Sequence, residues 1–133
     1  MDVREKKVTI VGLGRTCISL VRLLLRERAV PFVTESADGP HLADAKAELD
    51  SLGVEYECGG HTDEAFAQAA VVVPSPGVSP ALPQIERARA AGADVVSELE
   101  FTFPFCRSKI LAVTGTNGKT TTTELLRALI GAC

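Results

Sequence analysis

The sequence predicts an α/β fold: a doubly wound parallel sheet of about five strands, covered by helices on both faces. Two observations predict it. Short apolar runs rich in valine and isoleucine alternate with segments in which apolar residues recur at helical spacing. The connections between them are brief, which favours a parallel sheet with right-handed crossovers. The chain has 133 residues, enough for one domain or one domain plus part of another.

The elements follow in order. Residues 8–13 indicate a buried strand, and residues 16–29 a helix with an apolar stripe and arginines on its other face. A strand at 31–35 precedes a helix that starts near Leu42 and ends at Gly53, a C-cap residue. The remaining predicted elements are a strand at 54–57, a helix at 62–69 with Thr62 as N-cap, a strand at 70–74, a helix at 82–91 and a strand at 94–97.

After residue 97 the pattern changes. Residues 98–105 indicate a short helix broken before Pro104, and residues 106–108 a linker. A new buried strand is predicted at 109–114, a glycine turn at 115–121 and a helix at 122–130. One strand, one loop and one helix cannot bury a core alone. We therefore expect residues 1–106 to form the first domain and residues 107–133 to be the linker and start of a truncated second domain.

Composition excludes several classes of protein. Fourteen basic and seventeen acidic residues give a net charge of −3, which disfavours a nucleic-acid binder. Four cysteines without a CxxC pair and only two histidines do not provide zinc-ligand spacing. The N-terminus has no apolar signal core, and no apolar run approaches the roughly 20 residues that span a bilayer. We expect a soluble cytoplasmic protein that does not bind membranes.

A first glycine turn, Gly12-Leu-Gly14-Arg-Thr-Cys17, lies between the first strand and the first helix, where dinucleotide-binding fingerprints occur. Glycines allow a close backbone approach to phosphate, and the helix start offers free N–H groups. Cys17 takes the place of the usual third glycine. Glu35 follows about 20 residues later, where an acidic residue accepts a ribose hydroxyl. A tight strand–helix turn without a ligand, and a solvated carboxylate, are the alternative interpretations.

The loop after the fourth strand, Ser75-Pro76-Gly77, is expected at the same edge of the sheet. In a doubly wound sheet the first and fourth strands are usually neighbours where strand order reverses, and ligands bind in that crevice. The loops at residues 12–16, 35–36 and 75–78 then converge on one site. An ordinary turn-rich loop is the alternative, and Arg15 either pairs with phosphate or lies over the helix.

A second glycine turn, Val113-Thr-Gly-Thr-Asn-Gly-Lys-Thr-Thr121, is the strongest signal in the chain. Such a turn folds its N–H groups around phosphate oxygens, a lysine reaches the terminal phosphates and a hydroxyl binds Mg²⁺. Lys119 and either Thr120 or Thr121 fill these roles. Val113 stands where the usual pattern has its first glycine. A glycine turn with an exposed lysine is the alternative.

The two turns together resemble the Mur ligases, ATP-dependent amino-acid ligases of peptidoglycan precursor synthesis. The resemblance spans essentially the whole chain and is carried by Gly12-Leu-Gly14-Arg-Thr16, Ser75-Pro-Gly-Val78, Glu98-Leu-Glu-Phe101 and residues 112–121. It implies that the Rossmann-like first domain binds the UDP part of a muramoyl substrate. The implied UDP-site residues are Gly14, Arg15 and Thr16 at the diphosphate, Glu35 and Ser36 at the uridine end, and Ser75, Pro76 and Gly77 on the opposite wall.

The resemblance also implies the reaction. ATP phosphorylates the substrate carboxylate, and an amine attacks the acyl phosphate to give an amide, ADP and phosphate. The ATP residues are then Gly115, Thr116, Asn117, Gly118, Lys119, Thr120 and Thr121, with Lys119 catalytic and Thr120 or Thr121 on Mg²⁺. The Gly-Leu-Gly-x-Thr start favours UDP-N-acetylmuramoyl-L-alanine and D-glutamate as substrates. The D-glutamate site and the other metal ligands are expected beyond Cys133, so this chain is expected to be an inactive monomer that binds UDP.

Three other readings remain open. One is a Rossmann-like regulatory module that senses NAD(H) through residues 12–17 and Glu35. A second is a P-loop NTPase preceded by a regulatory domain. A third keeps the chemistry and changes the substrate, to that of another Mur or folylpolyglutamate-type ligase. The NAD reading leaves the second turn unexplained and the NTPase reading leaves the first unexplained, whereas the ligase reading explains both.

Overall fold

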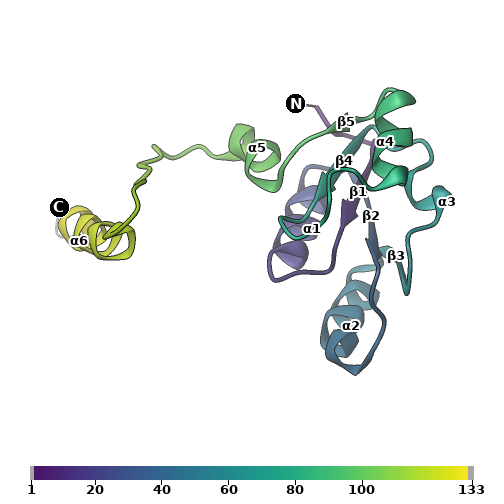
Figure 1. Ribbon diagram of the computed structural model, residues 1–133, viewed down its shortest axis with the longest axis horizontal. Helices are drawn as coiled ribbons and strands as arrows, with labels where there is room; N and C mark the ends of the chain where they lie inside the picture. Colours follow the sequence, from purple (N-terminus) through teal and green to yellow (C-terminus); the bar gives the residue numbers. More distant parts are fainter. Residues whose placement is uncertain (1, 132–133) are drawn as a thin grey trace.

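Five parallel strands form the single sheet of the computed structural model, which describes residues 2–131 (Figure 1). Their order is β3-β2-β1-β4-β5, so strand order reverses between β1 and β4. The strands are β1 (Lys7–Val11), β2 (Val30–Glu35), β3 (Glu55–Cys58), β4 (Val71–Pro74) and β5 (Asp94–Val95). The predicted doubly wound α/β fold is confirmed for this part of the chain.

Helices cover both faces of the sheet because alternate strand residues point to opposite sides. Val8 and Ile10 pack into a core with α1 (Cys17–Arg26) and α2 (Ala43–Leu52). Val11 packs into a second core with α3 (Asp63–Phe66) and α4 (Pro83–Ala90). Thr9 is fully buried on the face that α3 covers, and its hydroxyl donates to the Ala65 carbonyl at 2.7 Å. Its burial therefore leaves no hydroxyl unsatisfied.

Capping residues set several of the helix ends. Gly53 ends α2 with a left-handed φ of 66°, and the Thr62 hydroxyl accepts from the Ala65 amide at the start of α3, as predicted. The helix predicted at 62–69 is shorter than expected: α3 ends at Phe66, because Ala67 leaves the helical conformation with a ψ of 131° and Gln68 follows with a φ of 58°. A short 3-10 helix, Pro40–Leu42, precedes α2.

The strand predicted at 109–114 is wrong. These residues have no regular secondary structure, and Ile110 and Leu111 are 53% and 65% exposed. A strand needs a partner for its backbone groups, and no other strand of residues 2–131 lies beside this segment. The chain leaves the sheet through α5 (Glu98–Thr102) and the 3-10 helix Phe103–Phe105, which includes Pro104, and ends in α6 (Lys119–Gly131), apart from the sheet (Figure 1).

Candidate functional site

The turn after β1 and the loop after β4 face each other because these strands are neighbours in the sheet. The Gly12 amide donates to the Thr34 carbonyl and the Ser75 amide to the Val11 carbonyl, both at 2.8 Å. Gly12 has a φ of +104°, and a Cβ placed on it would lie 3.0 Å from the Ser75 Cβ and Oγ. Glycine is therefore required here both for its backbone conformation and for the close approach of the two loops.

The residues predicted for the UDP site gather around this turn. Gly14, Arg15 and Thr16 are exposed at the start of α1, and Ser36, Pro76 and Gly77 are exposed on the neighbouring loops. Glu35 and Ser75 are half-buried between them. The parallel pairing of β1 with β2 and β4 places the ends of these strands at one edge of the sheet. Glu35 and Ser75 join the ends through hydrogen bonds with the Leu13 amide and the Gly12 carbonyl.

Glu35 binds the glycine turn itself. Its carboxylate accepts from the Leu13 amide at 2.7 Å and from the Ala37 amide at 2.8 Å, and the Ser36 hydroxyl donates to it at 3.1 Å. Burial alone would raise the pKa of Glu35, but the amides of Ala37 and Leu13 and the Ser36 hydroxyl stabilise the charged form. The net result is a pKa below the ordinary value. Glu35 therefore fixes the shape of the turn as an anion.

Glu98 is the residue that sequence reasoning did not assign to the site. The Thr16 hydroxyl lies 2.8 and 2.7 Å from its two carboxylate oxygens, and the Ser75 hydroxyl lies 3.3 Å from one of them. A carboxylate from α5 thus joins the first glycine turn to the loop after β4. The sequence signal for this residue is the motif Glu98-Leu-Glu-Phe101, which contributes to the family resemblance but carries no site role by itself.

Cys17, which replaces the third glycine of the fingerprint, is fully buried as the first residue of α1. Burial, together with the negative charges of Glu98 and Glu35, raises the pKa of its thiol to about 12. A thiol in this state is not a nucleophile near neutral pH. Cys17 therefore acts as a small core residue beneath the turn.

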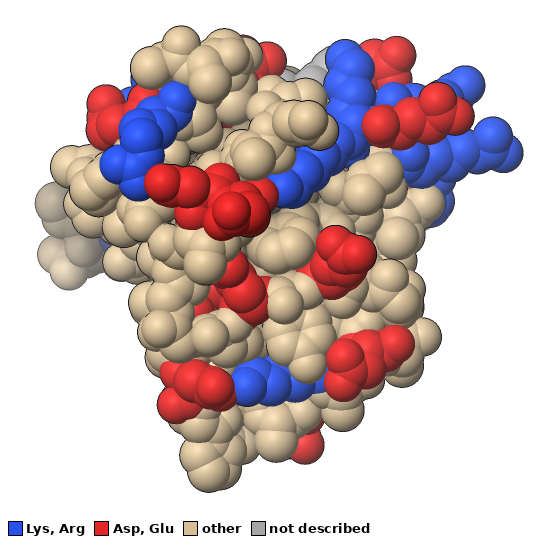
Figure 2. Space-filling model, turned by 90° about the vertical axis from the view of Figure 1, so that its right-hand side faces the viewer, with Lys and Arg blue, Asp and Glu red and all other residues tan. Residues whose placement is uncertain are grey.

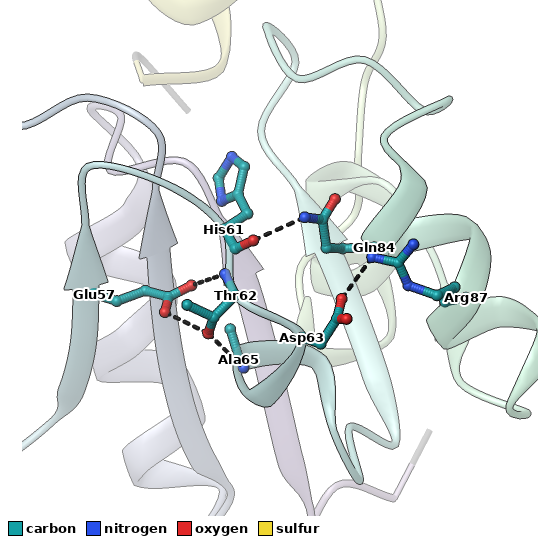
Figure 3. A network of polar contacts seen from close by, with 7 residues as sticks. All are labelled: Glu57, His61, Thr62, Asp63, Ala65, Gln84 and Arg87. Atoms are coloured by element: carbon teal, nitrogen blue, oxygen red, sulfur yellow. Dashed lines mark hydrogen bonds and ion pairs between the residues drawn. The ribbon is translucent and has the colours of Figure 1, made fainter.

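A second polar network holds the loop after β3 (Figure 3). The Glu57 carboxylate accepts from the Thr62 amide at 2.9 Å and hydroxyl at 2.6 Å, and from the Thr34 hydroxyl at 2.6 Å. The Gln84 amide group donates to the His61 carbonyl at 2.7 Å, joining α4 to this loop (Figure 3). Burial raises the pKa of Glu57, but the hydrogen bonds from Thr34 and Thr62 outweigh it and the net pKa is lowered.

The second glycine turn lies outside the sheet domain. Residues 115–121 are exposed, Gly115 and Gly118 have φ values of 150° and 75°, and the Lys119 ammonium donates to the Gly115 carbonyl. Thr120 and Thr121 form part of the first turn of α6. Nowhere in residues 2–131 do three His, Cys, Asp or Glu side chains cluster as metal ligands. This turn presents backbone, lysine and hydroxyl groups to solvent.

Charges are mixed on the face shown in Figure 2, where basic side chains stand beside acidic ones. Elsewhere and on this face alike, the pairing is local: among the described residues Arg22 pairs with Glu48 and Arg87 with Asp63, both at 2.6 Å. Local geometry, and not a broad positive field, must therefore hold any anion. No helix of the described residues has the length and apolar character needed to cross a membrane.

The fold and the paired loops identify the class of protein: residues 6–97 match the family described as "Mur ligase MurD-like, N-terminal domain", and the chain belongs to it. Its curated relatives include UDP-N-acetylmuramoylalanine–D-glutamate ligases. The Geobacter sp. (strain M21) protein is 40% identical over all of this chain and 29% of its own length. The Salinibacter ruber protein is 48% identical over 93% of this chain and 26% of its own length. The chain thus spans under a third of these relatives.

Solved structures agree on the fold. UDP-N-acetylmuramate-alanine ligase MurC from Thermotoga maritima is 26% identical with a TM-score of 0.61, over 91% of this chain and 28% of that chain. A pseudomurein peptide ligase type C from Methanothermus fervidus is 24% identical with a TM-score of 0.57, over 92% of this chain and 25% of that chain. D-lactate dehydrogenase from Escherichia coli, at 18% identity and a TM-score of 0.53 over 73% of this chain and 29% of that chain, shares the fold alone.

Proposed function

We propose that the chain is the N-terminal part of an ATP-dependent ligase that joins D-glutamate to UDP-N-acetylmuramoyl-L-alanine through an acyl phosphate. Its first domain, residues 1–106, binds the UDP moiety. The observation that carries this proposal is the convergence of the first glycine turn, Glu35 and the Ser75 loop where strand order reverses, in a chain of the MurD-like family.

The diphosphate lies at the start of α1, between Arg15 and Thr16 on one side and the Ser75 loop on the other. Gly14 lets the backbone come close, and the α1 N-terminus contributes free amides and the positive end of its dipole. The uridine lies toward Ser36, and Pro76 and Gly77 form the opposite wall. Because Glu35 already accepts from two backbone amides, it shapes this site more than it recognises a ribose.

Residues 107–133 supply the first ATP-binding elements of the second domain. The turn formed by Gly115, Thr116, Asn117, Gly118, Lys119, Thr120 and Thr121 fits a polyphosphate, because two glycines with positive φ expose its amides and Lys119 starts a 13-residue helix. Lys119 binds the phosphoryl oxygens, and Thr120 or Thr121 offers a hydroxyl to Mg²⁺. Bound Mg²⁺ supplies charge neutralisation at the transferred phosphoryl group. The complete enzyme acts in the cytoplasm, and this chain is a monomer.

A titration followed by amide NMR tests the first site. The 133-residue chain is titrated with UDP, UDP-N-acetylmuramoyl-L-alanine and NAD. The two uridine ligands are expected to shift the amides of residues 12–16 and those of Ser75, Gly77 and Val78. Thr16→Val, which keeps the backbone amide and removes the hydroxyl, should weaken UDP binding about tenfold. Thr120→Val, the matched change in the second turn, should leave it unchanged. A response of residues 12–16 to NAD in preference to UDP would refute the proposal.

The second turn is tested by calorimetry with MgATP. Without the rest of its sheet the turn is poorly preorganised, so we expect affinity weaker than micromolar and no release of ADP that depends on D-glutamate. Micromolar affinity would show that residues 107–131 form a complete site without further chain. Turnover coupled to D-glutamate would contradict the assignment of the remaining catalytic residues to the part of the enzyme beyond Cys133.

A further inference from the structure

We propose that Glu98 is an internal substitute for the substrate's diphosphate. Its carboxylate occupies the hydroxyls of Thr16 and Ser75 in the free protein and must move away when the nucleotide binds. The inference rests on the proposed UDP site and adds to it a residue that sets nucleotide affinity by competition.

Thr16 can hydrogen-bond to only one of the two anions at a time. Its hydroxyl lies 2.7 and 2.8 Å from the two Glu98 oxygens and has a single proton to donate. A carboxylate and a phosphate oxygen are both pure acceptors, so Thr16 cannot donate to a phosphate while it donates to Glu98. The Ser75 hydroxyl, 3.3 Å from Glu98, faces the same choice. One anion therefore has to replace the other.

Electrostatics points the same way. Thr16 is the N-cap of α1, and an acceptor beside it benefits from the positive end of the helix dipole. Glu98 takes this place as an anion without a basic partner: no lysine or arginine among residues 2–131 forms an ion pair with it. A diphosphate that entered beside it would meet a like charge at close range. The hydroxyls of Thr16 and Ser75 and the N-terminus of α1 hold the Glu98 carboxylate in place. The diphosphate of a nucleotide can replace the carboxylate at these groups.

Helix α5 holds the backbone of Glu98 beside the first glycine turn. Phe101, three residues later and on the same side of the helix, is fully buried and anchors α5 in the core. The Thr102 hydroxyl donates to the Glu98 carbonyl at 2.8 Å, a bond that fixes the backbone and does not involve the carboxylate. Glu98 lines an open groove of about 420 Å³ between α1 and α5, so its carboxylate can turn away from Thr16 toward solvent.

Binding of UDP and of uridine to Glu98→Gln tests the proposal. Glutamine keeps an acceptor oxygen for Thr16 and removes the charge, so we expect UDP to bind about fivefold more tightly. Uridine, which has no diphosphate, should bind as it does to the wild type. Glu100→Gln, an exposed acid in the same turn of α5, is the control and should leave both affinities unchanged.

The outcomes distinguish failure of the proposed UDP site from failure of competition by Glu98. If the wild type binds UDP at residues 12–16 and Glu98→Gln binds it no more tightly, competition by Glu98 is refuted and the proposed function stands. If the wild type does not bind UDP there, both fail. Should Glu98→Gln unfold, Glu98→Ala gives the same test. A tighter uridine complex in either variant would also refute competition, because the gain must require the diphosphate.

Discussion

Replacing Gly12 by alanine tests the close approach of the two loops that form the site. Two costs can be worked out from the structure. A φ of +104° costs an L-residue about 1–2 kcal/mol, and a Cβ at 3.0 Å from both Ser75 Cβ and Oγ forces the neighbouring loop to shift, at about 1–2 kcal/mol more. We expect Gly12→Ala to lower the free energy of unfolding by about 2–4 kcal/mol, as the sum of these two costs.

Two other glycines serve as matched controls. Gly53 has a φ of 66° but open space around its Cβ position, so Gly53→Ala should cost only the backbone part, about 1 kcal/mol. Gly77 has open space as well and no positive φ, so Gly77→Ala should change stability by less than about 0.5 kcal/mol. Urea unfolding followed by far-ultraviolet circular dichroism measures all three variants, because the chain has no tryptophan.

A double-mutant cycle isolates the contact with Ser75. Ser75→Gly removes both atoms that lie at 3.0 Å from the added methyl group. In the Gly12→Ala background it should therefore recover about 1–2 kcal/mol relative to its effect in the wild type. The reasoning is refuted if Gly12→Ala costs no more than Gly53→Ala, or if the cycle shows no coupling between positions 12 and 75.

Three further predictions concern single side chains. The pKa of Glu35 is lowered from 4.5 in the folded state, so its contribution to stability is complete above pH 4.5 and is lost as pH falls through the folded pKa. The urea midpoint of Glu35→Gln should therefore drop less between pH 7 and pH 3 than that of the wild type. An equal drop in the two proteins would contradict this prediction. Phe101→Ala should lower the free energy of unfolding, measured in urea, by about 3–5 kcal/mol. Phe103→Ala, at a 62% exposed position, should lower it by less than about 0.5 kcal/mol. Similar costs for the two variants would argue against Phe101 as the anchor of α5. Iodoacetamide at pH 8 should modify Cys106 in the native chain and leave Cys17 unmodified, as read by peptide mass spectrometry; fast labelling of Cys17 would contradict its burial.

The sheet domain could be predicted from the sequence because its signals are local. Buried strands appear as short apolar runs, helices as apolar stripes, and Gly53 and Thr62 mark helix ends through their own backbone and side-chain chemistry. The first glycine turn was found for the same reason. Element ends were less accurate, because a residue such as Gln68 takes up its positive φ only in the packed structure.

The sequence also predicts where the backbone can approach a ligand, since a positive φ and a helix start are properties of a few consecutive residues. Contacts between residues that are distant in the sequence could not be predicted in this way. The apolar run at 109–114 does not form a strand without neighbours. Thr16 and Glu98 are 82 positions apart and meet only because β1 and β4 pair and Phe101 anchors α5. A hydrogen bond of that kind comes from packing, so the tertiary structure alone decides which anion occupies the turn.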